Sequence, residues 1–248
     1  MSLRLLDVHK SFGDLVVLDG VSLDFPMGRT TAIIGPSGTG KSVLVKHLVG
    51  LITPDRGTVE CFGVDVGRAS HSELMALRKR FGMLFQDGAL FDNMTVAENV
   101  AFPLVHNRPD LNAAQRKARV EVVLEQVELP GFQDRPIAGL SGGQRKRVGL
   151  ARAIAAEPEV VLFDEPNSGL DPFTSDAIDE LIRTMQRQLG ITFIVISHDI
   201  VGTLNVADWI GMLYEGKLIA YGRTEELLEN PHPVLRRFLA RNRPELRA

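Results

Sequence analysis

The sequence has little cysteine and no strong excess of either charge. Its 248 residues include one cysteine, Cys61, so no internal disulfide can form and we expect this side chain to be a small packed residue. The net charge of −3 gives no overall electrostatic support for nucleic-acid binding. No run reaches the roughly 18 apolar residues of a transmembrane helix, and the N-terminus lacks the apolar region of a signal peptide. These absences favour the cytosol, with any membrane role exerted through a partner.

The chain does have enough apolar sequence for a large folded core. Hydrophobic residues make up 44% and charged residues 24%, which excludes disorder for most of it. Short apolar runs alternate with helical patterns, and this alternation predicts a mostly parallel α/β core.

A glycine-rich turn follows the first buried run, "TTAIIGP" at residues 30–36. Gly35, Gly40, Lys41 and Ser42 fill the fixed positions of G-x-x-x-x-G-K-[ST], and a helical pattern follows. Backbone N–H groups of residues 36–42 can surround a β-phosphate, Lys41 can reach the β and γ oxygens, and the Ser42 hydroxyl can coordinate Mg²⁺. The strand, loop and helix order favours a phosphate site over a turn without a ligand.

Two further apolar runs end in polar side chains. Residues 160–163 predict a buried strand, after which Asp164 can hold Mg²⁺ and Glu165 can polarise a water molecule for attack on a γ-phosphate. The run "ITFIVISHDI" at residues 191–200 brings His198 to a strand end, where ligands of α/β sheets bind. The alternatives, a solvated strand end and a structural histidine, are less compatible with a neighbouring phosphate loop.

The stretch "LSGGQ" at residues 140–144 stands where a helical pattern begins. Ser141 can cap that helix, and the two small residues after it, Gly142 and Gly143, let another group approach the free N–H groups of the first turn. We therefore expect an anion to dock there.

Together these motifs resemble those of the ATP-binding cassette family, the ATPase subunits of ABC transporters, over essentially the whole chain. Gly35 to Ser42 resemble its Walker A loop, Gln86 its Q-loop, residues 140–144 its signature, residues 160–165 its Walker B strand, residues 168–171 its D-loop and His198 its switch histidine.

The resemblance implies a set of site residues for ATP and Mg²⁺. Nucleotide contacts are implied at Phe12, Gly35, Pro36, Ser37, Gly38, Thr39, Gly40, Lys41, Ser42, Val43, Ser141, Gly142, Gly143, Gln144 and Asp171. Catalytic roles are implied for Gln86, Glu165 and His198, and Mg²⁺ ligation for Ser42, Gln86 and Asp164. Phe12 falls where the family stacks an aromatic ring on adenine, although a core position is the alternative. Val43 and Asn167 depart from the commonest family pattern, and neither departure removes a catalytic group.

The implied fold is a P-loop NTPase of ABC type, with a mostly parallel core sheet, an antiparallel β subdomain and an inserted α-helical subdomain. Residues 1–248 would form one ATPase domain. Residues 1–85 and 156–248 would make the RecA-like core with the β subdomain, and residues 86–155 the helical subdomain.

The resemblance also implies partners. Two copies would meet head to tail, so that ATP held by one copy is the anion expected at Ser141 of the other. A coupling helix of a membrane permease would dock on the apolar segment 81–111, linked to the γ-phosphate by Gln86. Leu84, Phe85, Leu90, Phe91 and Phe102 give this segment its apolar character, and some of them can instead fill the subdomain's own core.

The wording around the motifs, as in "SGTGKSVLVKHLVGL", is most similar to ATPases of Mla/Mce-type systems, which move phospholipids or related lipids between membranes. This likeness implies an MlaE-like permease, an Mce-type lipid-binding protein, a small regulatory subunit in some systems, and a peripheral place on the cytoplasmic face of the inner membrane.

Three other functional classes share parts of the pattern. An ATPase of an amino-acid or other small-solute importer would have the same catalytic residues. Nontransport cassette ATPases, which handle DNA or ribosomes, typically carry long insertions or tandem cassettes that are missing here. A small-molecule kinase would share the phosphate loop and have no use for residues 140–144.

Overall fold

A computed structural model describes residues 2–85 and 89–242. It divides into two compact units, Met1–Arg78 with Thr192–Ala248, and Lys79–Ile191. Among the described residues, no helix combines the length and hydrophobicity needed to cross a membrane.

The first unit contains an antiparallel sheet of four strands. Its strands are β1 (Leu3–Phe12), β2 (Leu15–Phe25), β4 (Arg56–Cys61) and β5 (Val64–Asp65), in the order β2-β1-β4-β5. In the register, Leu5 lies opposite Leu23 on one side and Val59 on the other, and all three are buried. Helix α2 (His71–Arg78) closes this stretch of the chain.

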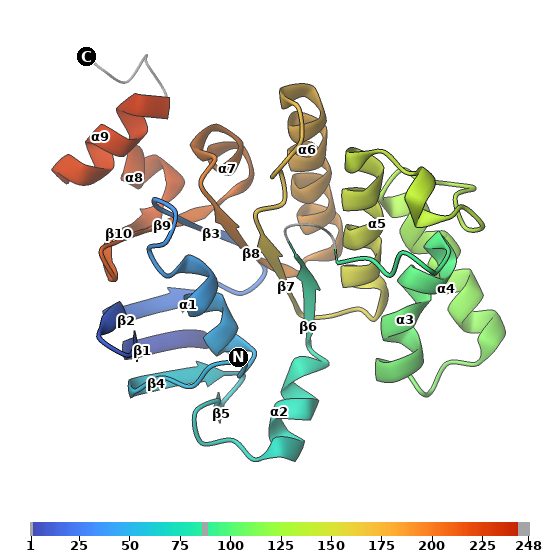
Figure 1. The fold of residues 1–248 in the computed structure, drawn as a ribbon, viewed down its shortest axis with the longest axis horizontal. Helices are drawn as coiled ribbons and strands as arrows, with labels where there is room; N and C mark the ends of the chain where they lie inside the picture. Colours follow the sequence, from blue (N-terminus) through green and yellow to red (C-terminus); the bar gives the residue numbers. More distant parts are fainter. Residues whose placement is uncertain (1, 86–88, 243–248) are drawn as a thin grey trace. The chain divides into compact units, whose positions relative to one another are not determined.

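The same unit holds parallel strands that carry part of the candidate site. Strand β3 (Thr30–Ile34) pairs in parallel with β8 (Thr192–Ser197) and β9 (Trp209–Tyr214), and β10 (Lys217–Arg223) pairs antiparallel with β9. Every residue of β3 and β8 is buried, as expected for parallel strands that are covered on both faces. The helices here are α1 (Lys41–Leu48), α7 (Ile200–Val206), α8 (Thr224–Glu229) and α9 (Pro233–Asn242) (Figure 1).

The second unit is mainly helical. It contains the parallel pair β6 (Phe81–Leu84) and β7 (Val160–Asp164), helices α3 (Val96–Asn107), α4 (Ala113–Gln126), α5 (Gly142–Ala155) and α6 (Pro172–Leu189), and the 3-10 turn η1 (Ile137–Gly139). Helices α3, α4 and α5 lie side by side in Figure 1 and contact one another. Capping boxes at Thr95 and Asn112 fix the starts of α3 and α4.

The predicted fold class is confirmed, because the chain combines parallel strands, an antiparallel sheet and helices in the predicted way. The boundaries 86–155 for a helical subdomain stay a prediction. The second compact unit also contains β6, β7 and α6, so its bounds differ from those of the predicted helical subdomain.

Candidate functional site

The phosphate loop of the first unit is built on glycine. Gly35 follows β3 with φ 148°, and a Cβ atom there would lie 2.1 Å from the Leu213 carbonyl oxygen, so only glycine fits. Gly40, with φ 95°, precedes α1, which has no side-chain cap. The first turn of α1 therefore keeps backbone N–H groups directed at the loop, as a phosphate site requires.

Lys41 lies across this loop. Its Nζ donates hydrogen bonds to the carbonyl oxygens of Gly35 (2.8 Å) and Pro36 (2.9 Å), and the Thr39 hydroxyl donates to Pro36 as well (2.9 Å). The lysine is buried, while Ser37 and Gly38 at the loop tip are exposed. A positive charge held over a ring of backbone groups fits a polyphosphate.

His198 leaves the sheet beside the phosphate loop. The parallel register of β3 and β8 pairs Ile34 with Ser197, so Gly35 and His198 follow neighbouring strands at the same edge. The Asp199 carboxylate then caps α7 by accepting from the Val201 and Gly202 N–H groups (3.0 and 3.3 Å). His198 is exposed at this edge, where a ligand can reach it.

In the second unit, two adjacent carboxylates follow β7. Asp164 is the last residue of the strand, and Glu165 adopts a left-handed backbone conformation with φ 53°. Such a conformation costs a residue other than glycine about 1 kcal/mol or more and is concentrated at functional sites. Lys146 of α5, a buried lysine, donates from Nζ to the Glu165 carbonyl oxygen at 3.4 Å and thereby ties this turn to the signature helix.

The signature residues form the start of α5 as the sequence predicts. The Ser141 hydroxyl accepts a hydrogen bond from the Gln144 N–H (3.3 Å), and the Gln144 side chain accepts from the Ser141 N–H (3.0 Å). The small residues also serve packing within the chain: a Cβ atom on Gly142 would lie 3.2 Å from Leu170, and one on Gly143 would lie 2.6 Å from the Thr174 methyl.

The D-loop ends in a second cap. The Asp171 carboxylate accepts from the Thr174 N–H (3.0 Å) and hydroxyl (2.6 Å), and these hydrogen bonds hold the pKa of Asp171 below its usual range. Before it, the Asn167 amide donates to the buried Asp179 carboxylate (2.8 Å). The unusual Asn167 thus fixes the loop to α6.

The roles predicted for two other site residues, Phe12 and Gln86, are not tested by these contacts. Phe12 is half-exposed, so it is not a core residue, and Lys10 Nζ lies 5.5 Å from its ring centre. Its stacking role stays a prediction. Gln86 lies outside the described residues, so its predicted contacts with metal and phosphate also stay predictions.

Sequence reasoning missed three residues of the second unit that support the site: Lys146, Thr174 and Asp179. Each acts through a contact between segments distant in sequence. The only signal for Lys146 or Asp179 is a charged side chain at a position that the helical pattern buries.

The two described residues that are predicted to bind Mg²⁺, Ser42 and Asp164, have side chains of the right chemical kind. No group of three or more His, Cys, Asp or Glu side chains that could hold a metal is found within residues 2–85 and 89–242. Mg²⁺ in nucleotide sites takes only one or two protein ligands beside phosphate oxygens and water. Ser42 at the first turn of α1 and Asp164 at the end of β7 are oxygen donors of this kind.

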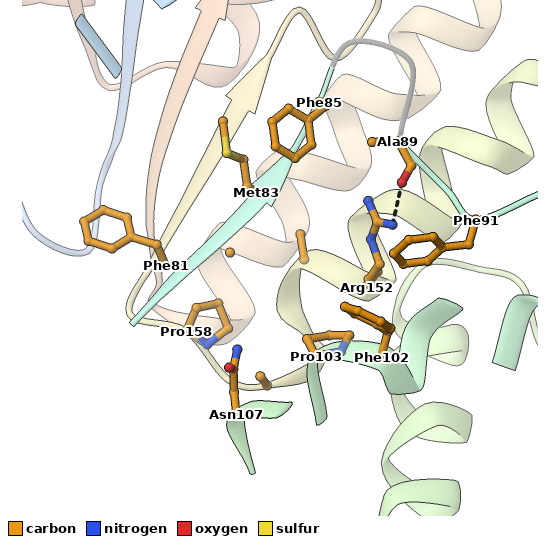
Figure 2. A pocket seen from close by; sticks show the side chains of 13 residues that line it. Phe81, Met83, Phe85, Ala89, Phe91, Phe102, Pro103, Asn107, Arg152 and Pro158 are labelled. Atoms are coloured by element: carbon orange, nitrogen blue, oxygen red, sulfur yellow. Dashed lines mark hydrogen bonds between the residues drawn. The ribbon is translucent and has the colours of Figure 1, made fainter. Parts of the chain in front are cut away.

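An apolar pocket of about 290 Å³ lies in the second unit (Figure 2). Four phenylalanines line it: the half-buried Phe81 of β6, and the more exposed Phe85, Phe91 and Phe102. The rings of Phe91 and Phe102 are 4.7 Å apart. Arg152 of α5 donates to the Ala89 carbonyl oxygen (2.7 Å), and its guanidinium faces the Phe91 ring at 5.9 Å. The pocket therefore combines aromatic walls with one cation.

Comparisons with known proteins agree with this geometry. The family model described as "ABC transporter" matches residues 18–168. MlaF of Escherichia coli K12, an intermembrane phospholipid transport system ATP-binding protein, is 42% identical over 94% of this chain and 86% of its own length. The probable ribonucleotide transport ATP-binding protein mkl of Mycobacterium leprae is 39% identical over 96% of this chain and 69% of its own length.

Solved structures give the same result. CbiO1 of Clostridium perfringens, part of the ABC transporter complex cbiONQ, has a TM-score of 0.85 at 30% identity and covers 98% of this chain and 96% of its own. The dimeric bacterial ABC transporter cassette MJ0796 has a TM-score of 0.81 at 30% identity, with 90% and 98% covered. With a family match over more than half its length, this chain belongs to the ABC transporter family as an ATP-binding cassette.

Proposed function

We propose that this chain hydrolyses ATP to power phospholipid transport between membranes, as the ATPase subunit of an ABC transporter. The observation that carries the proposal is a complete phosphate loop in a chain that is 42% identical to MlaF over nearly its whole length. Substitution of Lys41 by alanine tests the ATPase: it should abolish steady-state hydrolysis, and an unchanged rate would contradict the proposal.

The chemistry follows from the residues at the strand ends. The Glu165 carboxylate accepts a proton from a water molecule whose oxygen attacks the γ-phosphorus, and the bond from that phosphorus to the ADP oxygen breaks. Lys41, the loop N–H groups and His198 stabilise the negative charge on the transferred group. Bound Mg²⁺, held by Ser42, Asp164 and Gln86, would neutralise charge on the β and γ oxygens.

Two copies of the chain form the working unit. ATP held by the phosphate loop of one copy is capped by the start of α5 in the other, where Ser141, Gly142 and Gly143 present a helix N-terminus to the γ-phosphate. The structural relative MJ0796 is dimeric. A Glu165→Gln chain, which binds ATP without hydrolysing it, should elute as a dimer on gel filtration with ATP and Mg²⁺. Elution only as a monomer at saturating ATP would contradict the dimer.

An integral membrane permease of the MlaE type docks at the aromatic pocket of the second unit. An apolar helix of the permease would cover Phe85, Phe91 and Phe102. A Phe102→Glu chain should lose the permease on affinity purification from membranes. The matched control is Val122→Glu on α4, since Val122 is 45% exposed and lies outside the pocket lining. Equal loss in both variants would contradict a specific docking site.

One experiment can identify both the transported species and the remaining subunits. In such an assembly this chain lies peripherally on the cytoplasmic face of the inner membrane, and the other subunits are an Mce-type lipid-binding protein and, in some systems, a small regulatory subunit. The second candidate is a small-solute transporter, which the ribonucleotide transport name of the mkl relative favours. A tagged Glu165→Gln chain, solubilised with ATP from native membranes and analysed by mass spectrometry, separates them: an MlaE-like permease with bound phospholipid supports lipid transport, and a permease of another class overturns it.

A further inference from the structure

Phe173, in the first turn of α6, is 87% exposed, more than any other large apolar side chain among the described residues. The buried stripe of α6 consists of Ile178, Leu181, Ile182 and Met185, and Phe173 lies outside it. The packing of α6 within the chain therefore does not use this ring. An exposed aromatic ring contributes favourable binding free energy when a partner buries it.

Phe173 stands beside the signature. Its neighbours Leu170 and Thr174 approach Gly142 and Gly143 so closely that Cβ atoms there would lie 3.2 and 2.6 Å from their side chains. The exposed ring is thus on the surface next to the start of α5, where the proposed dimer brings the γ-phosphate of the second copy. It is continuous with that interface.

The first unit carries an exposed apolar group in the matching place. Val201 of α7 is 41% exposed, while its neighbours Ile200 and Gly202 are buried. It lies three residues after His198, which follows the strand next to the phosphate loop. Leu15 and Val16 are also exposed in this unit, but they stand near Phe12, at the proposed adenine end of the nucleotide. Val201 is therefore an exposed apolar group near the proposed γ-phosphate end, the end that the signature caps.

We infer that Phe173 of one copy packs against Val201 of a second copy when ATP bridges them. The inference rests on the proposed dimer and names an apolar contact that stabilises it beside the nucleotide. In a two-fold dimer each contact occurs twice, so one substitution removes two contacts.

The test is a double-mutant cycle in the Glu165→Gln background. Sedimentation velocity with ATP and Mg²⁺ would give the dimer Kd for Phe173→Ala, Val201→Ala and the double variant. We expect Phe173→Ala to raise Kd about 100-fold, from about tenfold at each symmetric contact. The double variant should be no weaker than Phe173→Ala alone, because both changes remove the same contact. Val122→Ala is the matched control for loss of an exposed apolar group in the same unit.

Two results would overturn the inference: a Phe173→Ala dimer as tight as the control, or a double variant whose loss is the product of the single losses. In either case an intact parent dimer would leave the proposed function standing. A Glu165→Gln parent that stays monomeric with ATP would overturn both.

A cross-link provides an independent readout. With an added mild oxidant, copper phenanthroline, which accepts the two electrons released by the two thiols, a Phe173→Cys chain mixed with a Val201→Cys chain should form a disulfide-linked pair only with ATP, since a disulfide requires Cα atoms within about 7 Å. The native Cys61 is buried and does not compete. No cross-link with ATP would overturn the contact.

Discussion

Substitution of Gly143 by alanine offers a sharp test of why the signature contains small residues. The added Cβ atom would lie 2.6 Å from the Thr174 methyl, whereas ordinary contact begins at 3.4 Å, so one of the two helices must shift by about 0.8 Å. Thr174 has little freedom to turn away, because its N–H and hydroxyl are both bonded to Asp171. The signature helix and the D-loop are therefore both disturbed.

Two opposing effects determine how much Gly143→Ala changes the free energy of unfolding. Alanine in place of glycine stabilises a helix by up to about 1 kcal/mol, and overpacking costs about 1–3 kcal/mol. We expect a net loss of about 1 kcal/mol, which lowers Tm by about 2–4 °C for a chain of this length. Differential scanning calorimetry measures this loss.

A second substitution separates packing from function. Thr174→Ser removes the methyl and keeps the hydroxyl that donates to Asp171, so the Gly143→Ala, Thr174→Ser chain should regain the lost Tm. Its ATPase rate should stay low, because the methyl on residue 143 would still lie where the proposed dimer brings the phosphate held by the second copy. The Thr174→Ser chain alone is the control. A Tm that does not recover would refute the steric reasoning, and an ATPase rate that recovers with Tm would mean that Gly143 serves packing alone.

Three further predictions concern single side chains. Gly35→Ala should prevent ATP binding, measured with a fluorescent analogue, because its Cβ atom would clash with the Leu213 carbonyl at 2.1 Å; wild-type affinity would contradict the loop geometry. Asp171→Asn should lower stability at pH 7, and the difference from wild type should shrink as pH falls below 3.8 through the depressed pKa of Asp171; a urea-unfolding difference that is constant down to pH 2.5 would refute this. Burial raises the pKa of the Cys61 thiol to about 12, so a thiol reagent at pH 8 should modify it only after unfolding, and rapid modification of the native protein would show otherwise.

Local patterns sufficed for much of the fold and for the phosphate loop. Glycine spacing and buried runs determine where β3 ends and α1 begins, and the Ser141 cap is visible in four consecutive residues. Burial explains the success for β7 and β8, since a run of apolar residues ending in a charge can hardly be exposed.

Contacts between distant segments were not predictable. The hydrogen bond from Lys146 to the Glu165 carbonyl joins a helix to a strand end nineteen residues later, and no periodicity in either segment reports it. The left-handed backbone of Glu165 is likewise hidden, because the sequence has a glutamate where glycine would be the signal. The exposure of Phe173 depends on which face of α6 is covered, which only the packed structure reveals.

One helix joins the two surfaces for which we propose different partners. Ser141 caps the N-terminus of α5, and Arg152 near its C-terminus lines the aromatic pocket, eleven residues or roughly 16 Å away. An α-helix resists compression along its axis. We therefore expect that a displacement of the N-terminus of α5 also displaces its C-terminus. Hydrogen exchange that changed in the first turn of α5 on ATP binding, with no change near Arg152, would contradict this. In this interpretation α5 moves as a rigid rod, and closure of the proposed nucleotide interface exerts a force on the docked permease.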